Sequence, residues 1–198
     1  GRKLRPVTRS FCRFALLGMF CLSVQGHDFG WIGTNSLALP QVGEHTLRII
    51  APTVLELTLI TTKKNESSPV SAWDFVGPNF APRIPDRSQF RVLVDGKENP
   101  VERVGFKRRP LYAPLKVRDL RILNQLYLET SVPVREGQRV EVHNPDQQLW
   151  TKERFQSVAD PLRFGPAVHV NQVGYEPNLP KRAMVGYFLG TAGELKIP

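Results

Sequence analysis

The chain has 198 residues and a formal net charge of +9, but five of its 27 basic residues, and no acidic one, lie within residues 1–13. Without them the formal charge falls to +4, which argues against a nucleic-acid-binding protein because such proteins concentrate far more positive charge. Both cysteines, Cys12 and Cys21, also precede residue 26, so the rest of the chain has no disulfide framework, thiolate zinc site or cysteine nucleophile.

The N-terminal region has the three-part layout of a secretory signal peptide. The basic residues are followed by an uncharged apolar run over 14–24 and then by Val24-Gln25-Gly26, a site that a signal peptidase can read. As a helix this run would span about 16 Å, roughly half of a hydrocarbon core, so we expect no permanent membrane span. We therefore predict a signal peptide over 1–26, a lead-in segment over 27–43 and a secreted or periplasmic location. The alternative is a buried helix.

The clearest strands come next. Residues 46–50 and 54–62 are apolar and β-branched, and in the second run Leu55, Leu57 and Leu59 share one face while Glu56 points to the other. A proline-rich connection over 63–88 follows, longer than loops usually are without a function. Residues 89–94 form a further strand, Asp95-Gly96 is a strong hairpin turn, and 101–106 would be the return strand.

The second half of the chain continues in the same style. Residues 120–128 alternate as a strand would, although part of the run also fits helical spacing, and 138–143 alternate again. Residues 160–166 are a short linker, and 167–173 and 181–189 begin a new pair of strands. We therefore predict an all-β, immunoglobulin-like or β-sandwich fold: an accessory sandwich over 44–165 and the first strands of a second, truncated sandwich over 166–198.

No catalytic or metal-binding motif stands out in this pattern. The four histidines have no spacing typical of a metal site, and neither a nucleophile elbow nor a phosphate-binding glycine loop occurs. Asp74 and the other carboxylates near strand ends have no signature that pairs any two of them for glycosidic chemistry. The sequence thus predicts no catalytic residue, no metal site and no cofactor.

Aromatic residues offer a possible carbohydrate-binding surface. Trp73 and Phe75 lie in the long proline-rich connection, and Trp150 lies near the end of the predicted sandwich. Exposed indole rings can stack on the apolar C–H faces of sugars. The alternative is that these rings fill the core of the sandwich.

A basic cluster precedes and enters the strand over 120–128. It suggests either a polyanion-binding patch or, as we favour, a solvated edge that discourages sheet addition. Its members are Lys107, Arg108, Arg109, Lys116, Arg118 and Arg121.

The C-terminal part carries a family resemblance. Residues 168–185 read Val-His-Val-Asn-Gln-Val-Gly-Tyr-Glu-Pro-Asn-Leu-Pro-Lys-Arg-Ala-Met-Val. This stretch resembles the opening of the N-terminal immunoglobulin-like domain of family 9 glycoside hydrolases, with its Val-Asn-Gln-x-Gly-Tyr strand and turn and its Pro-Lys-x-Ala strand. Gly174 would supply the turn and Tyr175 an aromatic anchor. Residues 44–165 resemble, more loosely, the extra β-rich domain that precedes it in some members.

The resemblance implies a function for a larger protein. Such enzymes are cellulase-type, inverting hydrolases of β-glucan whose catalytic residues lie in an (α/α)-barrel after the immunoglobulin-like domain. No catalytic residue can be carried onto this sequence, so the expected role is non-catalytic: to support or orient the barrel of the same polypeptide, with polysaccharide as a possible partner. The alternatives are a stand-alone carbohydrate-binding module and an extracellular structural or adhesion sandwich.

Overall fold

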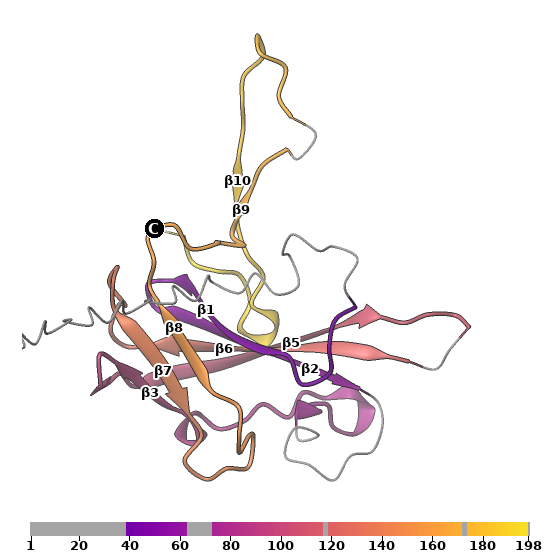
Figure 1. Cartoon of the computed structure of the whole chain (residues 1–198), viewed down its shortest axis with the longest axis vertical. Helices are drawn as coiled ribbons and strands as arrows, with labels where there is room; N and C mark the ends of the chain where they lie inside the picture. Colours follow the sequence, from indigo (N-terminus) through magenta and orange to yellow (C-terminus); the bar gives the residue numbers. More distant parts are fainter. Residues whose placement is uncertain (1–38, 63–72, 117–118, 172–173, 198) are drawn as a thin grey trace, which may run out of the picture.

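The computed structural model describes residues 39–62, 73–116, 119–171 and 174–197 (Figure 1). The chain is all-β over these ranges, with short 3-10 turns and no α-helix. Its strands are β1 (His45–Ala51), β2 (Val54–Thr62), β3 (Arg91–Val94), β4 (Lys97–Glu98), β5 (Val101–Tyr112), β6 (Arg121–Thr130), β7 (Arg139–His143), β8 (Phe155–Val158), β9 (Val168–His169) and β10 (Met184–Val185). The 3-10 turns are η2 (Pro78–Phe80), η3 (Arg87–Gln89) and η4 (Gly190–Ala192). The predicted signal peptide lies outside the described residues.

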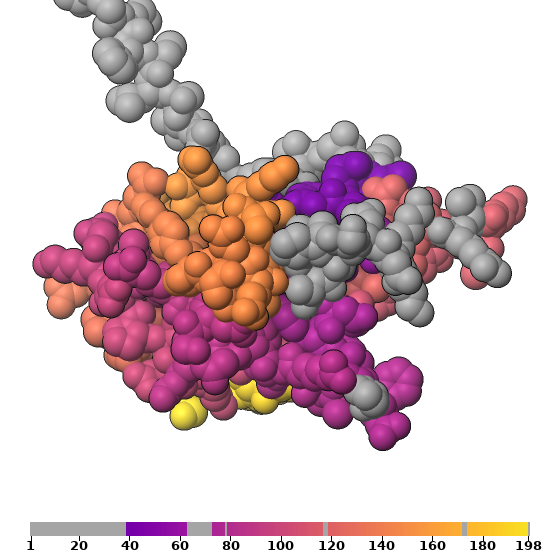
Figure 2. Space-filling model, turned by 90° about the horizontal axis from the view of Figure 1, so that it is seen from below, coloured from indigo at the N-terminus to yellow at the C-terminus, as the bar shows by residue number. Residues whose placement is uncertain are grey.

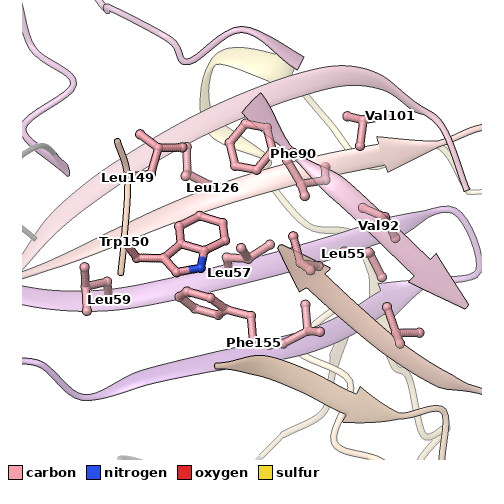
Figure 3. Packing of buried hydrophobic residues seen from close by; sticks show 14 of the residues in the cluster. Leu55, Leu57, Leu59, Phe90, Val92, Val101, Leu126, Leu149, Trp150 and Phe155 are labelled. Atoms are coloured by element: carbon pink, nitrogen blue, oxygen red, sulfur yellow. The ribbon is translucent and has the colours of Figure 1, made fainter. Parts of the chain in front are cut away.

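Two four-stranded antiparallel sheets face each other in a sandwich-like arrangement. One has the strand order β1-β2-β6-β5 and the other β4-β3-β7-β8. The apolar side chains of alternate residues meet between them, so that Leu55 and Leu57 of β2 pack toward Val92, Trp150 and Phe155 (Figure 3). The leucine face predicted for β2 is therefore confirmed.

The predicted Asp95-Gly96 hairpin is confirmed, but its return strand is not the one expected. Both turn residues have positive φ, 48° and 76°, and Val94 pairs with Lys97 across the two-residue turn. The return strand is the two-residue β4, whereas residues 101–112 form β5 in the opposite sheet. Pro100 cannot donate to a ladder, and the buried Asn99 donates from its side chain to the carbonyl of Val132, which holds the chain where it crosses between sheets.

Residues 120–128 are a strand, as alternation indicated; β6 pairs with β2 on one side and β5 on the other. Its central position protects both edges of β6, and almost every residue of the strand is buried, on both faces of the sheet. Beyond the sandwich, β9 and β10 form a separate two-stranded ribbon that projects from the body (Figure 1). Both of its strands are shorter than the sequence predicts, and its strand side chains are exposed because the described residues provide no further strand beside them.

The projecting parts of the molecule contrast with its packed centre. The loop end of the β5–β6 hairpin extends beyond the sheets at one side (Figures 1 and 2). After the ribbon, the chain returns to the sandwich and residues 187–195, which include η4, lie against the β1-β2-β6-β5 sheet on the side opposite the main core. We call residues 187–195 the docked segment, and that side of the sheet the outer face.

Candidate docking site on the outer sheet face

The three aromatic residues predicted as sugar contacts all lie in the core. Trp73, Phe75 and Trp150 are 0%, 5% and 5% exposed. The Trp73 ring stacks on Phe155, and its indole N–H donates to the carbonyl of Leu149 at 2.9 Å. Buried on all sides, these rings offer no face on which a sugar could stack. The structure thus supports the alternative interpretation, in which they fill the sandwich.

Three members of the basic cluster engage other side chains, two of them acidic, and Arg118 lies outside the described residues. Arg108 forms an ion pair with Asp74, and Arg121 forms one with Asp119 at 2.9 Å. Lys107 is half-buried, with its ammonium 5.3 Å from the ring centroid of Tyr187. Charges engaged in this way contribute less to an electrostatic surface for a polyanion. The cluster therefore fits the solvated edge better than the binding patch.

The outer face carries the feature that sequence reasoning did not identify. The strand register places Glu56 of β2 opposite Tyr127 of β6, and Gln125 lies two residue pairs further along, on the same face of the sheet. Glu56 and Tyr127 are both 0% exposed and Gln125 is 4% exposed. In an antiparallel sheet with one face on the core and the other in water, these three polar residues would be exposed; here they are buried.

The docked segment provides that cover through close backbone approach. Gly105 lies opposite Tyr127 in the β5–β6 pairing, and a Cβ at this position would come within 2.6 Å of the Cβ of Ala192. Gly190 has a φ of +64°, and a Cβ there would overlap the carbonyl of Phe106. Two glycines, one on each partner, therefore let the segment lie directly on the sheet.

A hydrogen bond joins the segment to the open edge of the sheet. β5 is an edge strand, and the backbone N–H of Phe106 donates to the hydroxyl of Thr191 at 2.9 Å. The segment keeps its own shape through backbone bonds from Leu189 to Gly193 and from Leu195 to Tyr187. Apolar contact completes the junction: Leu189 and Ala192 pack with Ile50 and Val54 in a cluster separate from the main core.

Glu56 is the polar centre of the junction. Its Oε1 accepts hydrogen bonds from the side-chain amide of Gln125 at 2.6 Å and from the hydroxyl of Tyr187 at 2.8 Å. Its Oε2 lies 3.6 Å from a guanidinium nitrogen of Arg48, whose side chain is 14% exposed. The buried carboxylate thus has an opposite charge on β1 and two donors, one of which comes from the docked segment.

The two tyrosines of the junction are held in their neutral form. Burial raises the pKa of Tyr187 to about 12, and the negative charge of Glu56 acts in the same direction. Burial, again together with Glu56, raises the pKa of Tyr127 far above the ordinary range of a tyrosine. The two rings meet edge to face, with centroids 6.1 Å apart. At neutral pH both phenols are therefore available only as hydroxyl groups.

The sequence contained two faint signals of this site. Glu56 is the charged residue of an otherwise uncharged strand, and Gly105 stands inside a strand, where glycine often marks close backbone approach. Neither residue indicates which segment covers it, because the contact joins positions more than 80 residues apart. Among the described residues, no cluster of three or more His, Cys, Asp or Glu side chains could hold a metal ion.

Comparisons with protein-family models, with curated proteins and with solved structures give no match for this chain. Within the part of the chain that the structure describes, no helix has the length and apolar character needed to cross a membrane.

Proposed function

We propose that this chain is the non-catalytic N-terminal region of a secreted or periplasmic glycoside hydrolase of the family 9 type. Its partner would be an (α/α)-barrel of the same polypeptide that acts on β-glucan or cellulose-type polysaccharide. Residues 166–198 would open an immunoglobulin-like domain, and the preceding sandwich would support or orient the catalytic part. The support from sequence is the resemblance over residues 168–185.

The observation that carries the proposal is the docking of residues 187–195 on the outer face. This segment directly follows the stretch that resembles the immunoglobulin-like domain, and it is fastened to the sandwich through Glu56, Phe106 and the close approach at Gly105. A chain that only linked two independent domains would not bury a carboxylate and a tyrosine, and half-bury a second tyrosine, at the junction. The geometry favours a fixed joint, which is what an orienting module needs.

A fixed joint acts through packing and not through chemistry. Burial of apolar surface stabilises a contact by roughly 25 cal/mol per Å², and hydrogen bonds fix the orientation of the two parts. The buried apolar side chains are Leu189 and Ala192, 1% and 8% exposed. The orienting hydrogen bonds are those of Tyr187 and Thr191. The expected consequence is a catalytic domain whose stability and placement depend on the sandwich.

The test is to read the coding sequence past codon 198 and then to perturb the joint in the complete polypeptide. A frame that continues into a helical barrel with an Asp/Glu pair supports the proposal, and the Gly105→Ala variant should then lower the thermal stability of the β-glucanase activity. Gly165→Ala is the matched control, because a Cβ at that position meets nothing within 4 Å. A stop codon directly after Pro198, or equal heat inactivation of both variants, would refute the proposal.

A further inference from the structure

The docked segment presents a small set of groups that the outer face recognises. It reads Tyr-Phe-Leu-Gly-Thr-Ala-Gly-Glu-Leu, in which a tyrosine precedes a tight turn of small residues. The turn is compact because Gly190 and Gly193 have positive φ and because Gly193 donates its N–H to the carbonyl of Gly190 at 3.0 Å. Only a turn built of small residues fits against Gly105 and the edge of β5.

The polar group opposite this turn is not satisfied by the sandwich alone. In the described structure, Gln125 and Tyr187 are the two donors of hydrogen bonds to Glu56, and Arg48 is the cation beside it. Without Tyr187, the buried oxygen would keep one donor. Three further polar atoms at this junction, Oε2 of Glu56, Oε1 of Gln125 and the hydroxyl of Tyr127, already lack a hydrogen-bond partner among the described residues. The loss of another bond at a buried charge is therefore costly.

The other contacts of Tyr187 leave its hydroxyl as the discriminating atom. Its ring meets Tyr127 edge to face and lies beneath the ammonium of Lys107, and a phenylalanine ring would keep both contacts. The hydroxyl alone reaches Glu56. A hydrogen bond to a charged acceptor is about twice as strong as one between neutral groups.

We infer that the outer face of the β1-β2-β6-β5 sheet is a recognition site for a glycine-rich turn preceded by tyrosine, and that Glu56 determines its specificity by accepting the hydroxyl of Tyr187. This inference rests on the proposed function, since it names the groups through which the sandwich holds the next domain. The turn provides the shape that fits the surface, and the hydroxyl provides the hydrogen bond that distinguishes tyrosine from other residues. A segment with phenylalanine at this position would fit the surface but would not donate a hydrogen bond to the carboxylate.

Amide hydrogen exchange of the full chain tests the inference. Tyr187→Phe should speed exchange of the amides of Leu189, Gly193 and Leu195 about tenfold, while the amides of residues 54–62 keep the wild-type rate. Tyr175→Phe is the matched control: it removes the same kind of group, a hydroxyl that donates to the carbonyl of Arg182 and accepts from Asn171, within the exposed ribbon.

A second variant separates recognition by the carboxylate from simple loss of contact. Glu56→Gln keeps an acceptor oxygen but removes the charge, so Tyr187→Phe in this background should speed exchange by about threefold instead of tenfold. If Tyr187→Phe accelerates amide exchange by the same factor in both backgrounds, the inference is overturned, because the effect of the hydroxyl would then not depend on the charge of Glu56.

The remaining outcomes also decide the matter. No change in Tyr187→Phe would mean that packing at the glycines holds the segment, and an equal acceleration over residues 54–62 would mean that segment and sandwich unfold as one unit; either result overturns the inference. Unprotected amides over 187–195 in the wild-type chain would instead remove the docking, and with it the proposed function.

Discussion

Replacement of Gly105 by alanine tests the junction at its tightest point. The added Cβ would lie 2.6 Å from the Cβ of Ala192 and 3.0 Å from the carbonyl oxygen of Leu189, both in the docked segment. Gly105 does not have a positive φ, so alanine introduces no backbone strain and the clash is the whole perturbation. The methyl group points away from the main core, which lies on the other side of the sheet. We therefore expect the segment to detach and the sandwich to remain folded.

The size of the effect follows from the overlap. Two carbon atoms at 2.6 Å are about 1 Å closer than their optimal separation, and overpacking of this kind costs about 1 to 3 kcal/mol. Because each 1.4 kcal/mol is a factor of ten, this corresponds to roughly 5- to 150-fold faster exchange of the segment's amides. The amides to follow are those of Leu189 and Leu195, which donate within the segment at 2.7 and 2.8 Å.

The assay is amide hydrogen exchange read by mass spectrometry, with peptides that cover residues 187–195 and residues 54–62. Gly165→Ala is again the control, because a Cβ at that site contacts nothing. Faster exchange confined to 187–195, and found only in Gly105→Ala, is the expected result. The reasoning is refuted if both glycine variants exchange alike, or if residues 54–62 accelerate by the same factor.

Three further predictions concern the core, the alkaline range and the hairpin. Trp150→Ala should lower the free energy of unfolding in urea by about 3 to 5 kcal/mol because the indole is 5% exposed. The control Leu162→Ala, at a side chain 90% exposed, should change it by less than about 0.5 kcal/mol. Similar values for the two variants would contradict the packing described. The pKa of Tyr187 is raised from 10.0 to about 12, so its hydroxyl should stabilise the fold fully below pH 10 and lose that contribution as the pH rises through 12. The difference in urea midpoint between wild type and Tyr187→Phe should therefore shrink over this range. A difference that stays constant with pH would contradict this prediction. Gly96→Val should cost about 1 to 2 kcal/mol of unfolding free energy, because a β-branched residue would have to adopt a φ of 76°; an unchanged thermal midpoint would show that the turn has another conformation.

Local sequence patterns predicted the elements of the sandwich well. The period-two alternation of Leu55, Leu57 and Leu59 indicated a strand with one core face, and the Asp-Gly pair at 95–96 indicated a two-residue turn. Both are local properties: alternation reflects the pleat of a single strand, and the turn depends on two residues that tolerate positive φ.

The position of the aromatic residues could not be predicted in the same way. Trp73 and Phe75 lie in a long proline-rich connection, where exposed and buried rings have the same local sequence. Their burial results from contacts with Leu149, Phe155 and Phe106, which come from distant parts of the chain. The return strand after Gly96 was misplaced for a related reason, since a crossing between sheets is set by the packing of the whole sandwich.

By itself, the sequence determined the all-β class, most of the strands of the sandwich and the turn at residues 95–96, because alternation and turn chemistry act between neighbouring residues. Only the tertiary structure decided that the polar side of β2 is covered, and by which segment. Glu56, Gly105 and Tyr187 lie on three separate parts of the chain, and each has an ordinary explanation when considered alone. Their common role exists only because the fold places a buried carboxylate, a strand without a side chain at the contact and a phenol hydroxyl in one junction.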